Sequence, residues 1–106
     1  MNIDKFKEMK NRIEEVVRIL LRDDRENINK VDQLIKDMAP LLSDMVTHLL
    51  QLKQNGVDIP IEIVMTQMEN LKNSYANKDM VLLADVLQYE IGDTIDFYIE
   101  ILKEIG

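Results

Sequence analysis

The chain has 106 residues, of which 46% are hydrophobic and 31% charged, and it contains one His and no Cys. This length and apolar content predict one folded domain, residues 1–106, rather than a disordered chain. Because thiolate chemistry, tetrahedral zinc sites and nucleophilic triads need Cys, His and Ser, we expect no enzyme and no cofactor.

The acidic excess is confined to the second half of the chain. Residues 54–106 contain three basic and ten acidic residues, whereas residues 1–53 contain ten of each, and the net charge is −7. Such a surface repels phosphate groups, which excludes nucleic acid as a partner and favours a protein with a basic surface or an amphipathic helix. The longest uninterrupted apolar stretch, Met80 to Ala84, is far shorter than the ~20 residues of a membrane helix, so we expect no membrane insertion and a cytoplasmic protein.

Apolar residues recur every three or four positions near the N-terminus, which predicts a first amphipathic helix. Asn2 is suited to cap it. The charged segment 22–26 interrupts the pattern, and Asp23 with Glu26 resembles a capping box that starts the second helix. The first apolar series is Ile3, Phe6, Met9, Ile13, Val16 and Leu20.

The second apolar series alternates steps of three and four and crosses Pro40 without losing phase. A proline within a helix removes one backbone hydrogen bond, so a break at Ala39 and Pro40 is the alternative to a kink. We expect a kinked helix over residues 24–54. The series is Ile28, Val31, Ile35, Met38, Leu42, Met45, Leu49 and Leu52.

Two further helices complete the chain. Asn55 and Gly56 predict a loop, the stripe from Ile61 to Tyr75 predicts the third helix, and Asp79 is suited to cap the fourth. The last segment is apolar around so much of its girth that it is either central or shared with a second chain. Gly92 lies within it, which indicates a kink or a close helix crossing. We expect an all-α fold, an antiparallel up-down four-helix bundle with connections at 22–25, 54–59 and 76–79.

A metal site is not favoured by the residue pattern. His48 follows Asp44 by four residues, which places both on one side of the second helix, off its apolar stripe. No third ligand can be assigned, so we expect a solvated surface pair and no metal.

The fourth helix carries the candidate partner-binding residues. Asp85, Tyr89, Asp93 and Asp96 lie near one side of it at three- and four-residue spacing. Val86 there and Met65 on the third helix lie off the apolar stripes, so they complete the set. The alternative is a solvated face on which Asp85 pairs with a basic residue of the first two helices.

The segment 79–91, preceded by Gly56 to Pro60, resembles a small bacterial all-helical family of unknown function. Its members read D-x-x-L-L-A-D-x-L-E-Y-E and occur beside motility or flagellin-modifying glycosyltransferases. Gln88 here replaces the family's Glu, and Gly92 lies near its Pro. The resemblance implies an accessory role near motility or surface glycosylation, without catalytic residues.

Three functions remain open on these observations. The first is a non-enzymatic protein–protein interaction module, an adaptor or chaperone-like accessory protein that binds a protein helix. The second is a self-associating structural homodimer whose fourth helices form the seam. The third is a bundle that binds a metal or a small molecule.

Overall fold

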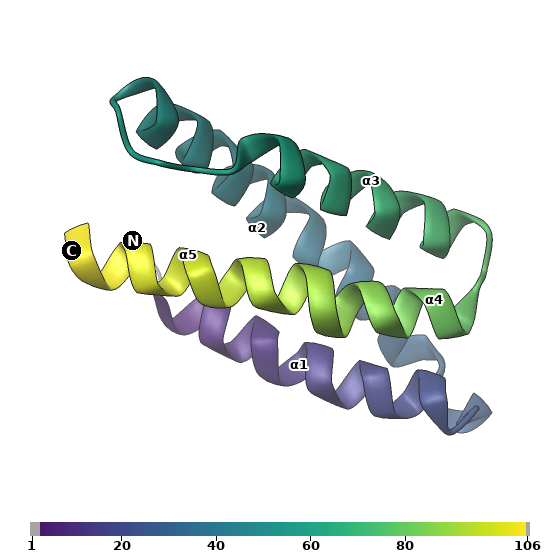
Figure 1. Ribbon diagram of the computed structural model, residues 1–106. Coiled ribbons are helices and arrows are strands. Elements are labelled where there is room, and N and C mark those ends of the chain that lie inside the picture. The colour runs from purple at the N-terminus through teal and green to yellow at the C-terminus, as the bar shows by residue number, and fades with distance from the viewer. Residues whose placement is uncertain (1–2, 106) are drawn as a thin grey trace.

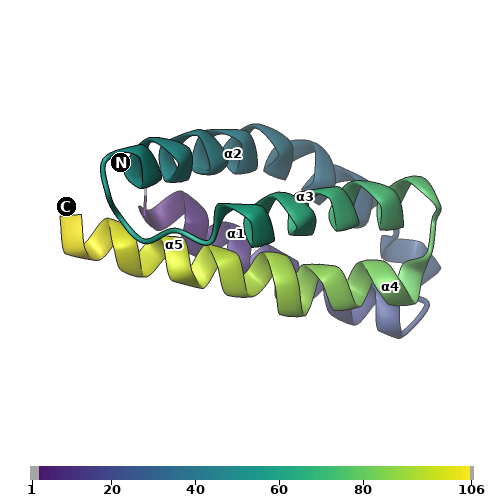
Figure 2. The ribbon, with the colours of Figure 1, turned by 45° about the horizontal axis from the view of Figure 1, so that its top comes forward.

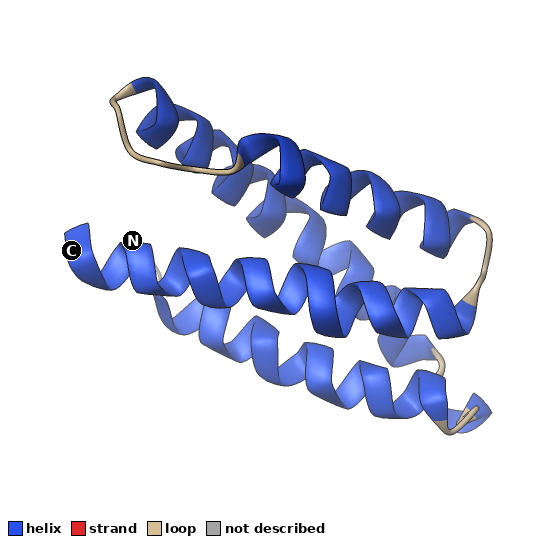
Figure 3. Cartoon of the chain, in the orientation of Figure 1, coloured by secondary structure: helices blue, strands red, loops and turns tan. Residues whose placement is uncertain are grey.

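A computed structural model describes residues 3–105, and the chain is helical throughout this range except for its connections (Figure 3). Asn2, expected to cap the first helix, lies outside the described residues. The last three elements follow one another without a break, so the chain has four long helical segments. The elements are α1 (Ile3–Leu21), the 3₁₀ turn η1 (Arg25–Asn27), α2 (Asn29–Gln54), α3 (Ile61–Ala76), α4 (Met80–Asp85), the π-helical turn η2 (Val86–Ile91) and α5 (Gly92–Ile105).

Each helical segment packs against two neighbours. The first, α1, contacts α2 on one side and α4, η2 and α5 on the other, while α3 contacts α2, α4 and η2. Both chain ends and the 55–60 loop lie at one end of the molecule, and the other two connections lie at the opposite end (Figure 1). Figure 2 shows the same arrangement from a second direction, over a body of 45 × 25 × 19 Å.

The predicted apolar face of α1 is confirmed, but the predicted start of the next helix is wrong. Asp23 adopts a positive φ of 51°, which turns the chain and removes its side chain from a capping position. The Asp24 carboxylate accepts a hydrogen bond from the Asn27 side chain at 2.7 Å. A 3₁₀ turn therefore precedes α2, which begins at Asn29 instead of residue 24.

Pro40 lies on the solvent-exposed side of α2, and the helix passes through it from Asn29 to Gln54. The alternative of a break at Pro40 is therefore wrong. The buried stripe is as expected except that Leu34 is buried, while Ile35 and Leu52 are only half-buried. Ile28 is exposed because it precedes the helix.

The two later connections follow the predicted turn chemistry. Gly56 adopts a φ of +93°, a conformation that residues with a side chain rarely reach, and it ends α2 with Asn55. The Asp79 carboxylate accepts a hydrogen bond from the backbone N–H of Leu82 at 3.2 Å. The predicted N-cap of the fourth helical segment is thus confirmed.

The π-helical turn η2 keeps one row of buried residues in the last helical segment facing the core. Its fully buried residues Leu83, Leu87, Ile91 and Ile95 are four apart. In a regular α-helix each step of four overshoots a full turn by about 40°, so three steps would rotate the stripe by about 120° away from the core. The π-turn accommodates one additional residue, with the Gly92 N–H bonded to Leu87 O five residues back. The stripe therefore continues to face the core.

Gly92 lies where a side chain would crowd the Leu87 carbonyl and the end of the Lys10 side chain. A Cβ atom at this position would lie 3.1 Å from the carbonyl oxygen of Leu87 and 3.3 Å from Cε of Lys10. On the α1 side the neighbour is the end of the Lys10 side chain, which passes over the backbone at Gly92. The local change in the helix is the π-turn that directly precedes Gly92.

Replacing Pro40 with Ala should raise the free energy of unfolding by about 1–3 kcal/mol, because it restores a backbone hydrogen bond at an exposed helical position. Urea unfolding monitored by circular dichroism measures the change. Pro60→Ala is the control, since Pro60 precedes the first turn of α3 and blocks no helical hydrogen bond. An unchanged or lower stability of Pro40→Ala would show that α2 has adapted fully to the proline.

Replacing Gly92 with Ala should lower the free energy of unfolding by about 1 kcal/mol, because overpacking against the Leu87 carbonyl outweighs the higher helix propensity of Ala. In a double-mutant cycle, Lys10→Ala should recover part of this loss, since it removes the second contact. A stabilised Gly92→Ala protein would contradict the close approach.

Candidate functional site

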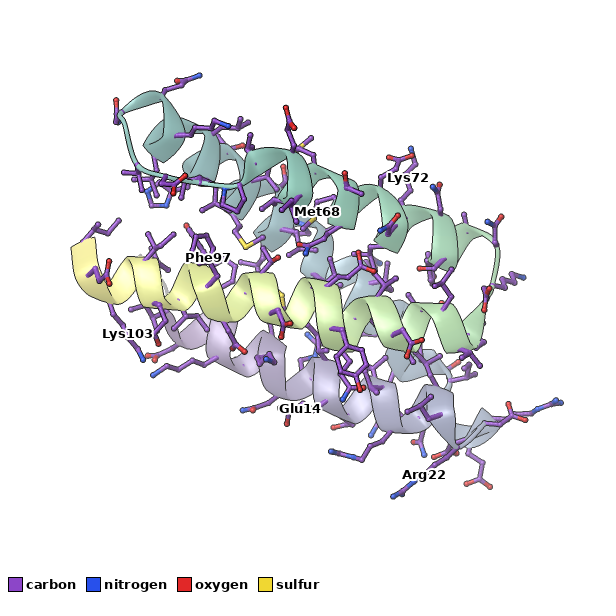
Figure 4. The ribbon with its side chains drawn as sticks, viewed as in Figure 1. Glu14, Arg22, Met68, Lys72, Phe97 and Lys103 are labelled. Carbon is purple, nitrogen blue, oxygen red and sulfur yellow. The ribbon has the colours of Figure 1, made fainter. Side chains whose placement is uncertain are left out.

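A groove of about 490 Å³ runs between α1 and the segment formed by η2 and α5. We call it the α1–η2 groove. The two helices that form it lie side by side in Figure 4, where Glu14 is labelled on α1. Its lining comprises Lys10, Ile13, Glu14, Val17, Arg18 and Leu21 from α1, and Gln88, Tyr89 and Asp93 from η2 and α5.

The apolar part of the groove has a buried floor and two exposed walls. Ile13 and Val17 are buried, and they form the floor. Leu21 is 58% exposed on the α1 side and Tyr89 is 63% exposed on the opposite side. These two side chains therefore leave apolar surface exposed to water on both sides of a concave floor.

The π-turn and Gly92 determine the shape of the groove. Gln88 and Tyr89 belong to the π-turn itself, so its widened backbone sets the direction of this wall. The Lys10 ammonium lies 3.4 Å from the Gly92 carbonyl oxygen and 2.5 Å from Oδ2 of Asp96. This ion pair marks the end of the groove nearest the C-terminal half of α5.

The two walls differ in charge. On the α4–α5 side, Asp93 lines the groove and Asp85 lies one turn before Tyr89, outside the lining. Both are exposed, and within the described range 3–105 neither makes an ion pair. The α1 side carries both signs, with Glu14 between Lys10 and Arg18. The α4–α5 side therefore carries only negative charge next to the groove, whereas on the α1 side Glu14 is the one acidic residue of the lining.

The structure brings together some of the residues that the sequence nominated. Tyr89 and Asp93 line the groove, Asp85 precedes Tyr89 by one turn, and Asp96 is bonded to the groove residue Lys10. Met65 is 50% exposed but lies on α3, outside the groove lining.

Val86 is a correction to the nominated set. Its side chain is only 1% exposed, because it lies three residues after Leu83 and directly before Leu87 and so shares their buried helical face. It is therefore unavailable to a partner.

The α1 side of the groove was missed by the sequence analysis. The apolar series considered there contained Ile13 but neither Val17 nor Leu21. These three residues are four apart, so a second apolar row on α1 was visible in the sequence. No sequence pattern of this kind marked the basic residues Lys10 and Arg18 as part of a groove.

His48 is not a solvated partner of Asp44, which corrects the expectation from spacing. His48 is half-buried, and its Nδ1 lies 2.7 Å from the hydroxyl of Tyr98 with the two rings edge to face. Tyr98 also packs edge to face on Phe6. Burial, and secondarily the charge of Asp44, raises the pKa of the Tyr98 hydroxyl. His48 and Tyr98 thus join α2 to α5, and because they are 50 residues apart no local sequence pattern reveals their contact.

Among the described residues, no group of three or more His, Cys, Asp or Glu side chains is placed to hold a metal ion. No helix within residues 3–105 has the length and apolar content that crossing a bilayer requires.

Residues 3–96 match the model of a protein family described as a domain of unknown function, DUF8042. The chain belongs to this family. The match includes every residue that lines the α1–η2 groove, so the groove lies within the DUF8042 domain. No curated protein and no solved structure matches the sequence.

Stability should fall above pH 10 because of Tyr98. A raised pKa means that the folded state holds this proton more tightly, so the contribution is fully present below the ordinary tyrosine pKa of about 10 and is lost as pH rises through the raised value. Urea unfolding between pH 8 and pH 11 measures the slope.

Tyr98→Phe should flatten this alkaline slope and cost about 1 kcal/mol at pH 8 through the lost hydrogen bond. Tyr89→Phe is the control for the loss of one tyrosine hydroxyl at a largely exposed position. An equally steep alkaline slope in Tyr98→Phe would contradict the assignment.

Proposed function

We propose that this DUF8042 protein is a non-enzymatic protein–protein interaction module that binds an amphipathic helix of a partner in the α1–η2 groove. In this proposal its four helical segments form an antiparallel up-down bundle, and α1 and the η2–α5 segment present the binding surface. The single observation that carries the proposal is the pair of exposed walls, Leu21 and Tyr89, on either side of a buried apolar floor. A helix that lays its apolar face between two helices is a recurrent mode of protein recognition.

Charge favours a basic partner over a second copy of the chain. A symmetric dimer whose two-fold axis passes close to Asp85 and Asp93 would bring these carboxylates near their own symmetry mates, because a two-fold interface uses the same patch twice. Like charges placed across an interface oppose association. A basic amphipathic helix meets the same carboxylates with attraction.

The physiological role that we propose is that of an adaptor or chaperone-like accessory protein in the cytoplasm. Its association with motility or surface glycosylation remains a prediction from the sequence motif in residues 79–91. The binding test depends neither on the adaptor role nor on the link to motility, because it needs only the purified chain and a synthetic helix.

The test is a titration of the ¹⁵N-labelled protein with an idealised peptide that carries Leu on one helical face and Lys on the other. The largest chemical-shift changes should map to the α1–η2 groove. Tyr89→Ala and Leu21→Ala should each weaken binding by on the order of tenfold, since they remove apolar contact surface without opening the core.

Met65→Ala is the matched control, because Met65 is equally exposed but lies on α3, and its binding should match that of the wild type. Shift changes centred on another face would contradict the proposal. So would groove resonances that move on simple dilution, since these would indicate self-association.

A further inference from the structure

We infer that the helix bound in the α1–η2 groove carries two basic residues seven positions apart, which pair with Asp85 and Asp93, and an apolar residue between them against Tyr89. This inference rests on the proposed function and specifies the chemistry of the partner. The structural basis is the placement of two unpaired carboxylates one turn before and one turn after the exposed tyrosine.

The spacing follows from helix geometry. Asp85 and Asp93 are eight residues apart on one continuous helical segment, which corresponds to about 12 Å of axial rise. Because a π-turn rises less per residue, the actual separation is slightly shorter. Two residues at positions i and i+7 of a partner helix lie on one face and are about 10.5 Å apart, so both reach a carboxylate at once.

These two carboxylates are available because their neighbours are already engaged within the chain. Asp79 caps α4, Glu90 accepts a hydrogen bond from Asn70 at 2.8 Å, Asp96 pairs with Lys10, and Glu100 pairs with Lys103 at 3.2 Å. Within the described part of the segment 79–105, only Asp85, Asp93 and Glu104 lack such a partner. Glu104 lies beyond the groove, three turns after Asp93, and serves as the internal control.

The opposite wall fixes the rotation of the partner helix about its axis. Arg18 on α1 repels basic side chains, whereas the charge of Lys10 is balanced by its ion pair with Asp96, so the partner must direct its basic edge toward α4 and α5. Its apolar residues at i+3 or i+4 then face Tyr89 and the floor of Ile13 and Val17. A helix with basic residues on both edges would place one of them against Arg18 and bind more weakly.

The experiment compares two synthetic peptides of identical composition by isothermal titration at 50 mM and 300 mM salt. One has Arg at positions i and i+7 with Leu at i+3 and i+4, and the other has the two Arg at i and i+5, which point to different sides of the helix. The first peptide should bind about tenfold more tightly at low salt, and most of this advantage should disappear at high salt.

Variants of the protein identify the carboxylates. Asp85→Asn and Asp93→Asn should each weaken binding of the first peptide about threefold, and the double variant about tenfold, because each removes one exposed ion pair. Glu104→Gln should bind as the wild type does. Asp93→Lys should recover affinity for a peptide with Glu at i+7, which a merely structural role of Asp93 cannot explain.

The outcomes separate this inference from the proposed function. Equal affinity of the two peptides, or variants at Asp85 and Asp93 that bind like the wild type, would overturn the spacing rule while Tyr89→Ala still weakens binding. If Tyr89→Ala also has no effect and the groove resonances do not shift, the proposed function fails with it.

Discussion

The structure depends on keeping four buried residues of the last helical segment, each four positions after the previous one, on a single line. An ordinary α-helix cannot do so, because 3.6 residues complete a turn. The chain meets this constraint with the π-turn η2, which places Leu83, Leu87, Ile91 and Ile95 in one core with exposures near zero. The packing of α1 and α3 against this segment follows from it, since both helices contact η2 directly.

The same turn links the core to the surface. Within η2, Val86 and Leu87 point inward, while Gln88 and Tyr89 form a wall of the α1–η2 groove. Gly92, the next residue after the turn, allows Lys10 to cross the backbone and reach Asp96. The floor of the groove, Ile13 and Val17, is therefore part of the core, and the backbone direction of its wall follows from how the core is filled.

Periodicity predicted the number of helical segments, the Asp79 cap and the turn at Gly56, because each depends on residues within one or two helical turns. It failed where two distant residues decide the outcome. The contact of His48 with Tyr98 joins positions 50 apart, and the alignment of Ile91 and Ile95 with Leu83 depends on a π-turn that the apolar pattern alone did not reveal. The candidate site was predicted on its α4–α5 side, where acidic residues and Tyr89 alternate, and missed on its α1 side, where Leu21 and Val17 form a second apolar row.

Hydrogen bonds between polar side chains fix the position of α3 along its neighbouring helices. The Thr94 hydroxyl bonds to Gln67, the Asn70 amide to Glu90, and the Tyr75 hydroxyl to Asp32, so α3 is tied to both of its neighbours through side chains that match only in one register. Apolar contacts alone would permit α3 to slide by one turn, because one methyl-bearing side chain can replace another. These pairs oppose such sliding.

The π-turn also determines how the last helical segment would respond to a change in its number of residues. It is equivalent to one residue inserted into an α-helix, and the rotation it absorbs is close to that of a single residue, about 100°. Removing any one residue from 86–91 would leave a regular helix in which residues 80–85 and 92–105 still present the same faces to α1 and α3. This segment is thus a position at which the deletion of one residue alters the surface wall that carries Tyr89 while leaving the interior in phase.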